Sequence, residues 1–299
     1  RAECVDNILN MEFFQSVLPR MRDLRCDWNV FFEVKSNLTR EHVRLLAGAG
    51  VKRIQPGIES LSSSILRTMR KGVRAIQNVN LLRWCRAYNI DASWNLLWGF
   101  PGESIQDYRD QLAVISAIPH LQPPASQGRL WLERFSPMFL ESHRYGIREV
   151  NPEPSYKAVY PNDVDLTRSA YFFNYVVDGA LPPESFSSIV ESLDAWRARW
   201  KSGSRPLLSC MSVPGLVRLV DSRDASRSGV YELEAELASI YMAFFEKPTG
   251  LSEAARTLGL PGERVEEAVE VFAEQGLMMR EGNAALALAV GDTSYVSAV

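Results

Sequence analysis

Five short runs of apolar and β-branched residues, each followed by a stretch with helical spacing, organise the first 140 residues. The strand-like runs are Ala2–Leu9, Trp28–Val34, Val51–Ile58, Ala92–Trp98 and Leu130–Phe135. Regular alternation of strand and helix is typical of parallel β/α units joined by right-handed crossovers. The pattern therefore predicts an α/β fold, with a partial (β/α) barrel of the TIM type over residues 1–140. A doubly wound open sheet is the alternative, although no GxGxxG or GxxxxGK phosphate loop supports it.

The remaining chain has a different pattern. Residues 141–227 contain recurrent prolines between helical stretches near Leu166–Val177 and Glu184–Lys201, which predicts an irregular helical segment packed on the barrel. In residues 228–299, three helical stretches precede a hairpin that turns at Glu281-Gly282-Asn283. That order predicts a small C-terminal winged-helix-like domain.

Charge argues against nucleic acid as a partner. The chain has a formal net charge of −3 and a pI near 5.8. The helix that would read DNA carries one basic residue, Arg264, among Glu263, Glu266, Glu267, Glu270 and Glu274. We therefore expect this domain to contact protein or to be structural. No apolar run reaches the roughly 18 residues that span a bilayer, and no signal or anchor motif occurs, so we expect no membrane partner and a cytoplasmic location.

The cysteines and histidines do not form a metal motif. Cys4, Cys26, Cys85 and Cys210 are far apart and make no CxxC, CxxxC or Cys/His cluster. The three histidines are not at ligand spacing on one helix. The sequence therefore predicts reduced thiols and no metal site built by this chain alone.

Polar residues cluster at the carboxyl ends of the predicted strands, where the reactive groups of (β/α) barrels lie. The candidate binding residues are Asp6, Asn7, Lys35, Glu59, Ser60, Asn95, Gly99, Phe100 and Arg134. If the strands share one sheet, these residues converge on one rim. Simpler roles exist for several of them, since Glu59 and Ser60 can cap the next helix, and Arg134 can pair with a neighbouring carboxylate.

Several of these runs carry a family resemblance. Gly57-Ile58-Glu59-Ser60, with the following Ile65–Gly72, resembles the fourth strand and helix of radical S-adenosylmethionine (SAM) enzymes that carry a cobalamin-binding domain. The run Asn95–Glu103 is similar to their fifth-strand motif, and Asp6-Asn7 to their second-strand motif. Leu132–Pro137 resembles the radical SAM proteins that mature ribosomally made peptides, the RiPP maturation radical SAM protein 1 group.

The resemblance implies a cofactor chemistry. In that family a CxxxCxxC loop holds a 4Fe–4S cluster, and SAM is cleaved to a 5′-deoxyadenosyl radical; in cobalamin-containing relatives methyl transfer can follow. Glu59 would then hydrogen-bond the ribose or amino group of SAM, Lys35 or Arg134 would offset its carboxylate, and Gly99 with Phe100 would cradle adenine. The implied partners are a precursor peptide and an electron donor such as ferredoxin or flavodoxin.

The sequence departs from the family pattern because it contains no CxxxCxxC. By strand count its first strand matches the family's second, so we expect the cluster segment, and any cobalamin domain, upstream of Arg1, and a fragment that is inactive alone. A degenerate relative is the alternative. Two other functions stay open: a peptide-binding scaffold without a cluster, and a hydrolytic barrel enzyme that uses paired carboxylates among Glu33, Glu59, Glu103 and Glu133.

Overall fold

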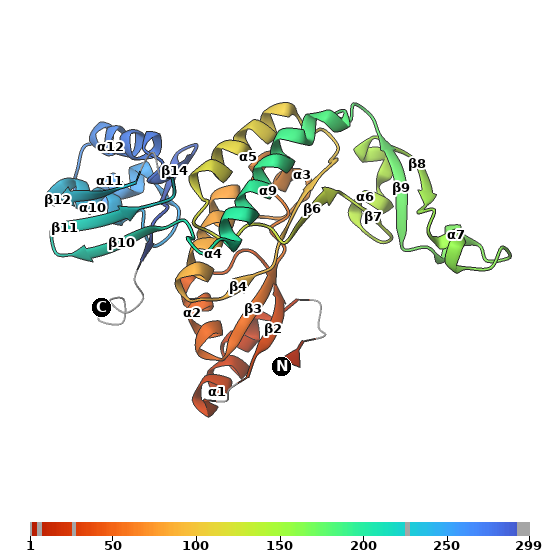
Figure 1. Ribbon diagram of the computed structural model, residues 1–299, viewed down its shortest axis with the longest axis horizontal. Helices are drawn as coiled ribbons and strands as arrows, with labels where there is room; N and C mark the ends of the chain where they lie inside the picture. Colours follow the sequence, from red (N-terminus) through yellow and green to blue (C-terminus); the bar gives the residue numbers. More distant parts are fainter. Residues whose placement is uncertain (1, 5–7, 26–27, 225–227, 292–299) are drawn as a thin grey trace.

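A computed structural model describes residues 2–4, 8–25, 28–224 and 228–291. A central sheet with its helices lies between an arm on one side and a C-terminal domain on the other (Figure 1). The candidate residues Asp6 and Asn7 lie outside the described residues. Within the described ranges, no helix is long and apolar enough to cross a membrane.

The central sheet is parallel and follows chain order. Its first four strands pair as neighbours in the order β1 (Ala2–Glu3), β2 (Val30–Val34), β3 (Val51–Pro56) and β4 (Asp91–Ala92). The last two are the parallel pair β5 (Asn95–Trp98) and β6 (Ser126–Arg129). A parallel bridge between Glu59 and Leu96 connects the two groups. The order lacks the reversal of a doubly wound sheet, so the structure is the partial (β/α) barrel that the sequence predicts.

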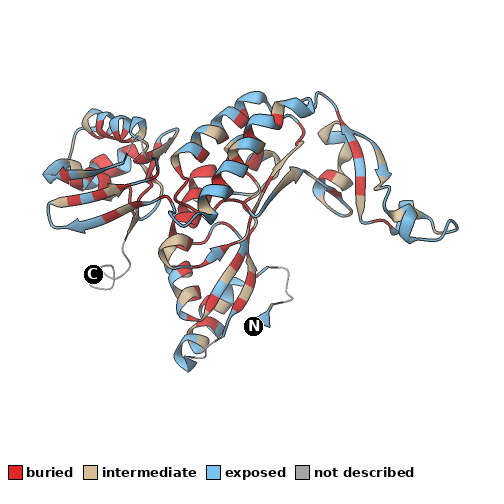
Figure 2. Cartoon of the chain, viewed as in Figure 1, coloured by how far each residue is buried: buried red, intermediate tan, exposed pale blue. Residues whose placement is uncertain are grey.

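Helices cover one face of this sheet (Figure 1). They are η1 (Met11–Phe14), α1 (Val17–Leu24), α2 (Arg40–Gly48), α3 (Ser63–Thr68), α4 (Ala75–Ala87) and α5 (Ile105–Ala117). Hydroxyl caps define three of the starts, because Thr39, Ser62 and Ser104 each accept a hydrogen bond from the backbone N–H three residues later. Fully buried side chains such as Ile54 and Val79 form the core between helices and sheet (Figure 2).

The sequence misplaced the last strand of the barrel. The predicted run Leu130–Phe135 is not in the parallel sheet, because the strand that pairs with β5 is β6, a polar Ser-Gln-Gly-Arg segment. Part of the predicted run forms β7 (Leu132–Glu133), which pairs antiparallel with β9 (Phe172–Val177). An edge strand beside a hollow needs little apolar character, so the more apolar run that followed was the stronger but misleading signal.

The arm spans residues 130–181 (Figure 1). Its sheet has the order β7-β9-β8, with β8 at Ile147–Pro152. Its short helices are α6 (Pro137–Leu140), η2 (Ser142–Tyr145), α7 (Tyr156–Val159) and α8 (Leu166–Ser169). The helix expected over Leu166–Val177 is wrong beyond α8, because alternate residues of β9 are buried, as in a half-buried strand. The other expected helix is confirmed as η3 (Pro183–Phe186) and α9 (Ser187–Lys201).

The C-terminal domain contains two small sheets and three helices. One sheet has the order β12-β11-β10-β16, and the other the order β13-β15-β14. Its strands are β10 (Leu208–Val213), β11 (Leu216–Asp221), β12 (Gly229–Glu234), β13 (Thr249–Gly250), β14 (Met278–Glu281), β15 (Ala284–Ala287) and β16 (Val290–Gly291). The helices α10 (Ala235–Ala243), α11 (Leu251–Leu258) and α12 (Gly262–Glu274) precede the β14–β15 hairpin, in the predicted order. In the first sheet, β10 and β11 precede residue 228 and β12 and β16 follow it, so this sheet extends across the predicted domain boundary.

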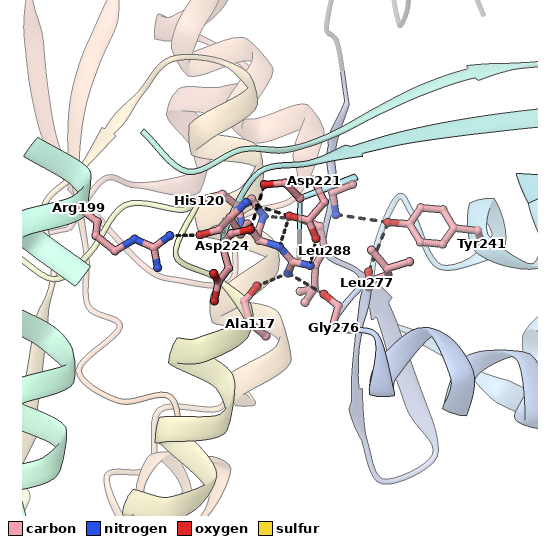
Figure 3. Close-up of polar contacts among 12 residues, drawn as sticks. Ala117, His120, Arg199, Asp221, Asp224, Tyr241, Gly276, Leu277 and Leu288 are labelled. Carbon is pink, nitrogen blue, oxygen red and sulfur yellow. Dashed lines mark hydrogen bonds and ion pairs between the residues drawn. The ribbon is translucent and has the colours of Figure 1, made fainter. Parts of the chain in front are cut away.

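Two buried arginines and a buried histidine attach this domain to the barrel. The Arg223 guanidinium donates to the carbonyl oxygens of Ala117, on α5, and Gly276, at 2.6 and 2.7 Å, and it pairs with Asp221. His120 Nε2 lies 2.9 Å from the carbonyl oxygen of Leu288 (Figure 3). On α4, the fully buried Arg83 donates to the carbonyl oxygen of Ala287 at 2.7 Å. Arg223 of the domain thus holds a carbonyl of the barrel, and Arg83 and His120 of the barrel hold carbonyls of the domain.

Candidate functional site

A hollow of about 650 Å³ lies along β5 and β6 and beside the carboxyl end of β3. Gln55 and Glu59 come from β3 and its extension, and Asn95 from β5. The arm contributes Trp131 and Phe172, whose rings pack edge to face at 4.8 Å. Polar side chains of the strands and aromatic side chains of the arm therefore line one hollow, which we call the main hollow.

Glu59 is held in an unusual backbone conformation. Its φ of 59° lies in the left-handed region, which costs a non-glycine residue about 1 kcal/mol or more. Its carbonyl oxygen accepts a hydrogen bond from the Leu97 N–H at 2.9 Å, which ties it to β5. Its carboxylate lies 3.5 Å from Lys71 Nζ on the wall of the main hollow. The helix cap that could have explained Glu59 is made by Ser62 instead.

Ser60 has a structural role. Its side chain is fully buried, its hydroxyl donates to Gln111 Oε1 at 3.0 Å, and it accepts from the Ser62 N–H at 3.0 Å. It does not line the main hollow. Ser60 therefore supports the loop that carries Glu59, and contact with a ligand is not its task.

A buried carboxylate shapes the turn after β5. Glu103 Oε2 accepts hydrogen bonds from the N–H groups of Gly99 and Phe100, both at 2.8 Å, and from the Tyr108 hydroxyl at 2.5 Å. Burial raises the pKa of Glu103. Gly99 has a φ of +85°, and a Cβ there would stand 2.9 Å from Cγ of Arg129. Phe100 is buried against the main hollow, whereas Gly99 lines an adjoining hollow of about 520 Å³.

The structure brings together some predicted residues and separates others. Glu59, Asn95 and Phe100 line the main hollow, and Asn95 Oδ1 accepts from the Ser126 hydroxyl at 2.6 Å. Lys35 is exposed and does not line it. Arg134 is not at the rim either, because it donates to the carbonyl oxygens of Ala170 and Thr167 at 2.6 and 2.7 Å within the arm.

Arg129 is the cation that the sequence analysis missed. It ends β6, lines both hollows, and lies 4.5 Å above the Tyr175 ring, donating to the Tyr175 carbonyl oxygen at 3.0 Å. Within the described residues it makes no ion pair with a carboxylate. The guanidinium of Arg129 therefore places an uncompensated positive charge at the wall of the main hollow. The misplaced strand boundary hid this signal, because it put Arg129 in a loop.

The donor sets fit a nucleoside better than a metal cluster. No group of three or more His, Cys, Asp or Glu residues that could hold a metal occurs in the described ranges. Burial raises the pKa of Cys85, and that of Cys210 to about 12, so these thiols are protonated at neutral pH. The main hollow, in contrast, offers amide, carboxylate and guanidinium groups beside an aromatic ring. Such groups can hydrogen-bond the hydroxyl and amino groups of a nucleoside while the ring packs against its base.

Comparison with known families identifies part of the chain. Residues 13–113 match the Radical SAM superfamily. This segment is a radical SAM domain. It contains Glu59, Asn95 and Phe100, and the family uses SAM together with a 4Fe–4S cluster. The cluster ligands are not found in the described part of this radical SAM domain.

The solved structures that resemble this chain have low sequence identity to it. The radical SAM methyltransferase TsrM from Kitasatospora setae is 16% identical, over 88% of this chain and 50% of its own, with a TM-score of 0.42. The cobalamin-dependent SAM radical enzyme OxsB is 16% identical over 43% of this chain and 20% of its own, with a TM-score of 0.31. The chain thus spans half or less of either protein. No curated protein gives a significant match.

Proposed function

We propose that the chain is part of a radical SAM enzyme and binds SAM in the main hollow. The observation that carries the proposal is the placement of Glu59. A strained backbone aims its carboxylate into the hollow, beside Asn95 and Phe100, within the segment that matches the family. When bound elsewhere in the enzyme, the 4Fe–4S cluster supplies the electron that cleaves SAM; the residues of this chain bind, orient and shield it.

Each lining residue has a distinct task in this proposal. The Glu59 carboxylate accepts hydrogen bonds from a ribose hydroxyl or the amino group of SAM, and Phe100 packs against adenine. Arg129 takes the role that the sequence gave to Lys35 or Arg134, since it is the guanidinium that lines the hollow. Trp131 and Phe172 of the arm exclude water from this side.

Glu59 provides the direct test. SAM should raise the melting temperature of the chain, and Glu59→Gln should weaken SAM binding about tenfold, because one charged hydrogen bond contributes about 1.5 kcal/mol. Isothermal titration with SAM measures the affinity. Glu184→Gln, a carboxamide change at an exposed position outside the hollow, is the matched control. Equal affinity in both variants, or no effect of SAM on the parent chain, would refute the assignment.

We also propose a ribosomally made precursor peptide as substrate, with cobalamin-dependent methyl transfer as the reaction. The support is the resemblance of Leu132–Pro137 and Gly57–Gly72 to those families. The C-terminal domain adds a physical argument. In the described part of the chain β12 pairs with β11 alone, so its other edge is open. An extended peptide can add to such an edge through main-chain hydrogen bonds.

Two exposed valines test the peptide proposal. Val230 on β12 and Val271 on α12 are 55% and 46% exposed. Val230→Asp should weaken binding of the precursor peptide encoded beside the gene about tenfold, because it places a charge on the pairing strand. Val271→Asp makes the same chemical change away from that edge. Fluorescence anisotropy of the labelled peptide measures both, and equal binding would contradict the proposed edge.

The other functions have less support. The hydrolytic alternative loses one of its four candidate carboxylates, because Glu103 holds the turn after β5. DNA binding is opposed by α12, where Arg264 already pairs with Glu236 and Glu267 at 2.8 and 2.9 Å. The electron donor and the cytoplasmic location remain predictions.

A further inference from the structure

A third hollow, of about 290 Å³, lies at the opposite end of the strand run that carries Asn95. Four parts of the chain form it: the end of α4, the start of β4, the loop after α5, and the end of α9 with the residues that follow. The residues that matter are Arg86, Asp91, Gln122, Trp200 and Arg205. No residue of this hollow lines the main hollow, so whatever binds here does so apart from the proposed SAM site.

Two guanidinium groups converge on one indole in this hollow. The Cζ atoms of Arg86 and Arg205 lie 5.2 and 4.9 Å from the ring centroid of Trp200. Stacking occupies the faces of the guanidinium groups and leaves the N–H groups at their edges free to donate. Within the described ranges, neither Arg86 nor Arg205 donates a side-chain hydrogen bond to another residue, and neither forms an ion pair with a carboxylate.

The two cations are close enough to disfavour each other. Burial first, and then the charge of Arg205, lower the pKa of Arg86. The contacts with the indole offset only part of the repulsion between the two unpaired guanidinium groups, and a bound anion would offset the rest. The arrangement therefore suits a ligand that brings negative charge.

The acidic residue of the hollow does not fill that role. Asp91 is the carboxylate that lines it, and this carboxylate already accepts from the Gln122 amide nitrogen. Gln122 Oε1 in turn accepts from the Ala92 N–H at 3.0 Å, which fixes the amide. Asp91 is thus engaged with the start of the strand, and two guanidinium charges face one carboxylate.

We propose that this hollow binds a small, multiply charged oxyanion, phosphate or carboxylate, through Arg86 and Arg205. The planar fork of each guanidinium matches two oxygens of either group. The two arginines come from elements more than a hundred residues apart, so the ligand would also join α4 to the segment after α9. The proposal does not depend on the radical SAM function.

Isothermal titration and thermal melting of the chain test the site, with inorganic phosphate and malonate as probes at constant ionic strength set by sodium chloride. We expect phosphate or malonate to bind and to raise the melting temperature. Arg205→Gln should weaken binding at least tenfold, and Arg86→Gln likewise. Arg109→Gln, at an exposed arginine on α5, should bind as the parent does.

The outcomes are decisive without any enzyme assay. The probe with the higher affinity identifies the source of the oxyanion as phosphoryl or carboxylate. Equal stabilisation by chloride would show a general salt effect and overturn the proposal, as would unchanged binding in Arg205→Gln. Because Arg205 is exposed, its variant should fold even if Arg86→Gln does not.

Discussion

Replacing Arg83 by methionine is expected to lower the free energy of unfolding by about 3 kcal/mol or more. The side chain is completely buried, and it donates to the carbonyl oxygen of Ala287 at 2.7 Å, to Asn80 Oδ1 at 3.1 Å and to the carbonyl oxygen of Phe245. Methionine preserves much of the volume but leaves these acceptors without a donor and without water. A buried acceptor that loses its partner costs about 1–3 kcal/mol.

Urea unfolding of the full chain measures this loss. The Arg83 guanidinium also lies over Trp84 and Phe245, 4.6 and 4.7 Å from their ring centroids. Arg83→Lys keeps the positive charge and some of the hydrogen bonds but not the stacking, so its stability should fall between that of the parent and that of Arg83→Met. Arg109→Met, at an exposed position, should change stability by less than about 0.5 kcal/mol. A parent-like Arg83→Met would show that the C-terminal domain is not anchored there.

The burial of Arg83 illustrates what the sequence could and could not predict. The position of helix α4 is recorded in its local sequence, because its apolar residues and the Gly72 that precedes it are local signals. That Arg83 would be buried under another domain depends on a contact more than 160 residues away, and no local pattern records it. An arginine within a helix is usually expected at the surface.

The main hollow likewise depends on both local signals, which the sequence records, and long-range contacts, which it does not. Glu59, Asn95 and Phe100 could be expected to lie together because each stands within or just after an apolar strand, and adjacent parallel strands bring such residues to one side of the sheet. Arg134 and Lys35 do not line the main hollow, because proximity to a strand end does not decide where a long side chain lies. Arg134 was further displaced by the arm, whose sheet includes part of the run predicted as the last strand of the series. Arg129 became visible only when β6 was located by its pairing with β5.

The stability of the chain should also depend on pH through His120. This side chain is 1% exposed, with Nε2 at 2.9 Å from the Leu288 carbonyl oxygen and no partner for Nδ1 among the described residues. Burial, and next the charge of Arg223, lower the pKa of His120 to about 3, from an ordinary value near 6.5. The folded chain keeps the ring neutral while the unfolded chain takes up a proton. The associated stability is therefore complete above pH 6.5 and is lost as the pH falls toward 3.

Between pH 7.5 and pH 5 this loss should amount to about 2 kcal/mol, because 1.5 pH units below 6.5 correspond to that free energy. Other groups titrate in the same range, so the comparison is between the parent and His120→Gln, whose amide can still donate to Leu288 but does not titrate. Urea unfolding at the two pH values should show a loss about 2 kcal/mol smaller in His120→Gln. His143→Gln, at an exposed histidine, should follow the parent. If His120→Gln lost as much stability as the parent between the two pH values, the His120 ring would take up a proton in the folded state. The contact between the C-terminal domain and the barrel would then open more readily than the burial of His120 implies.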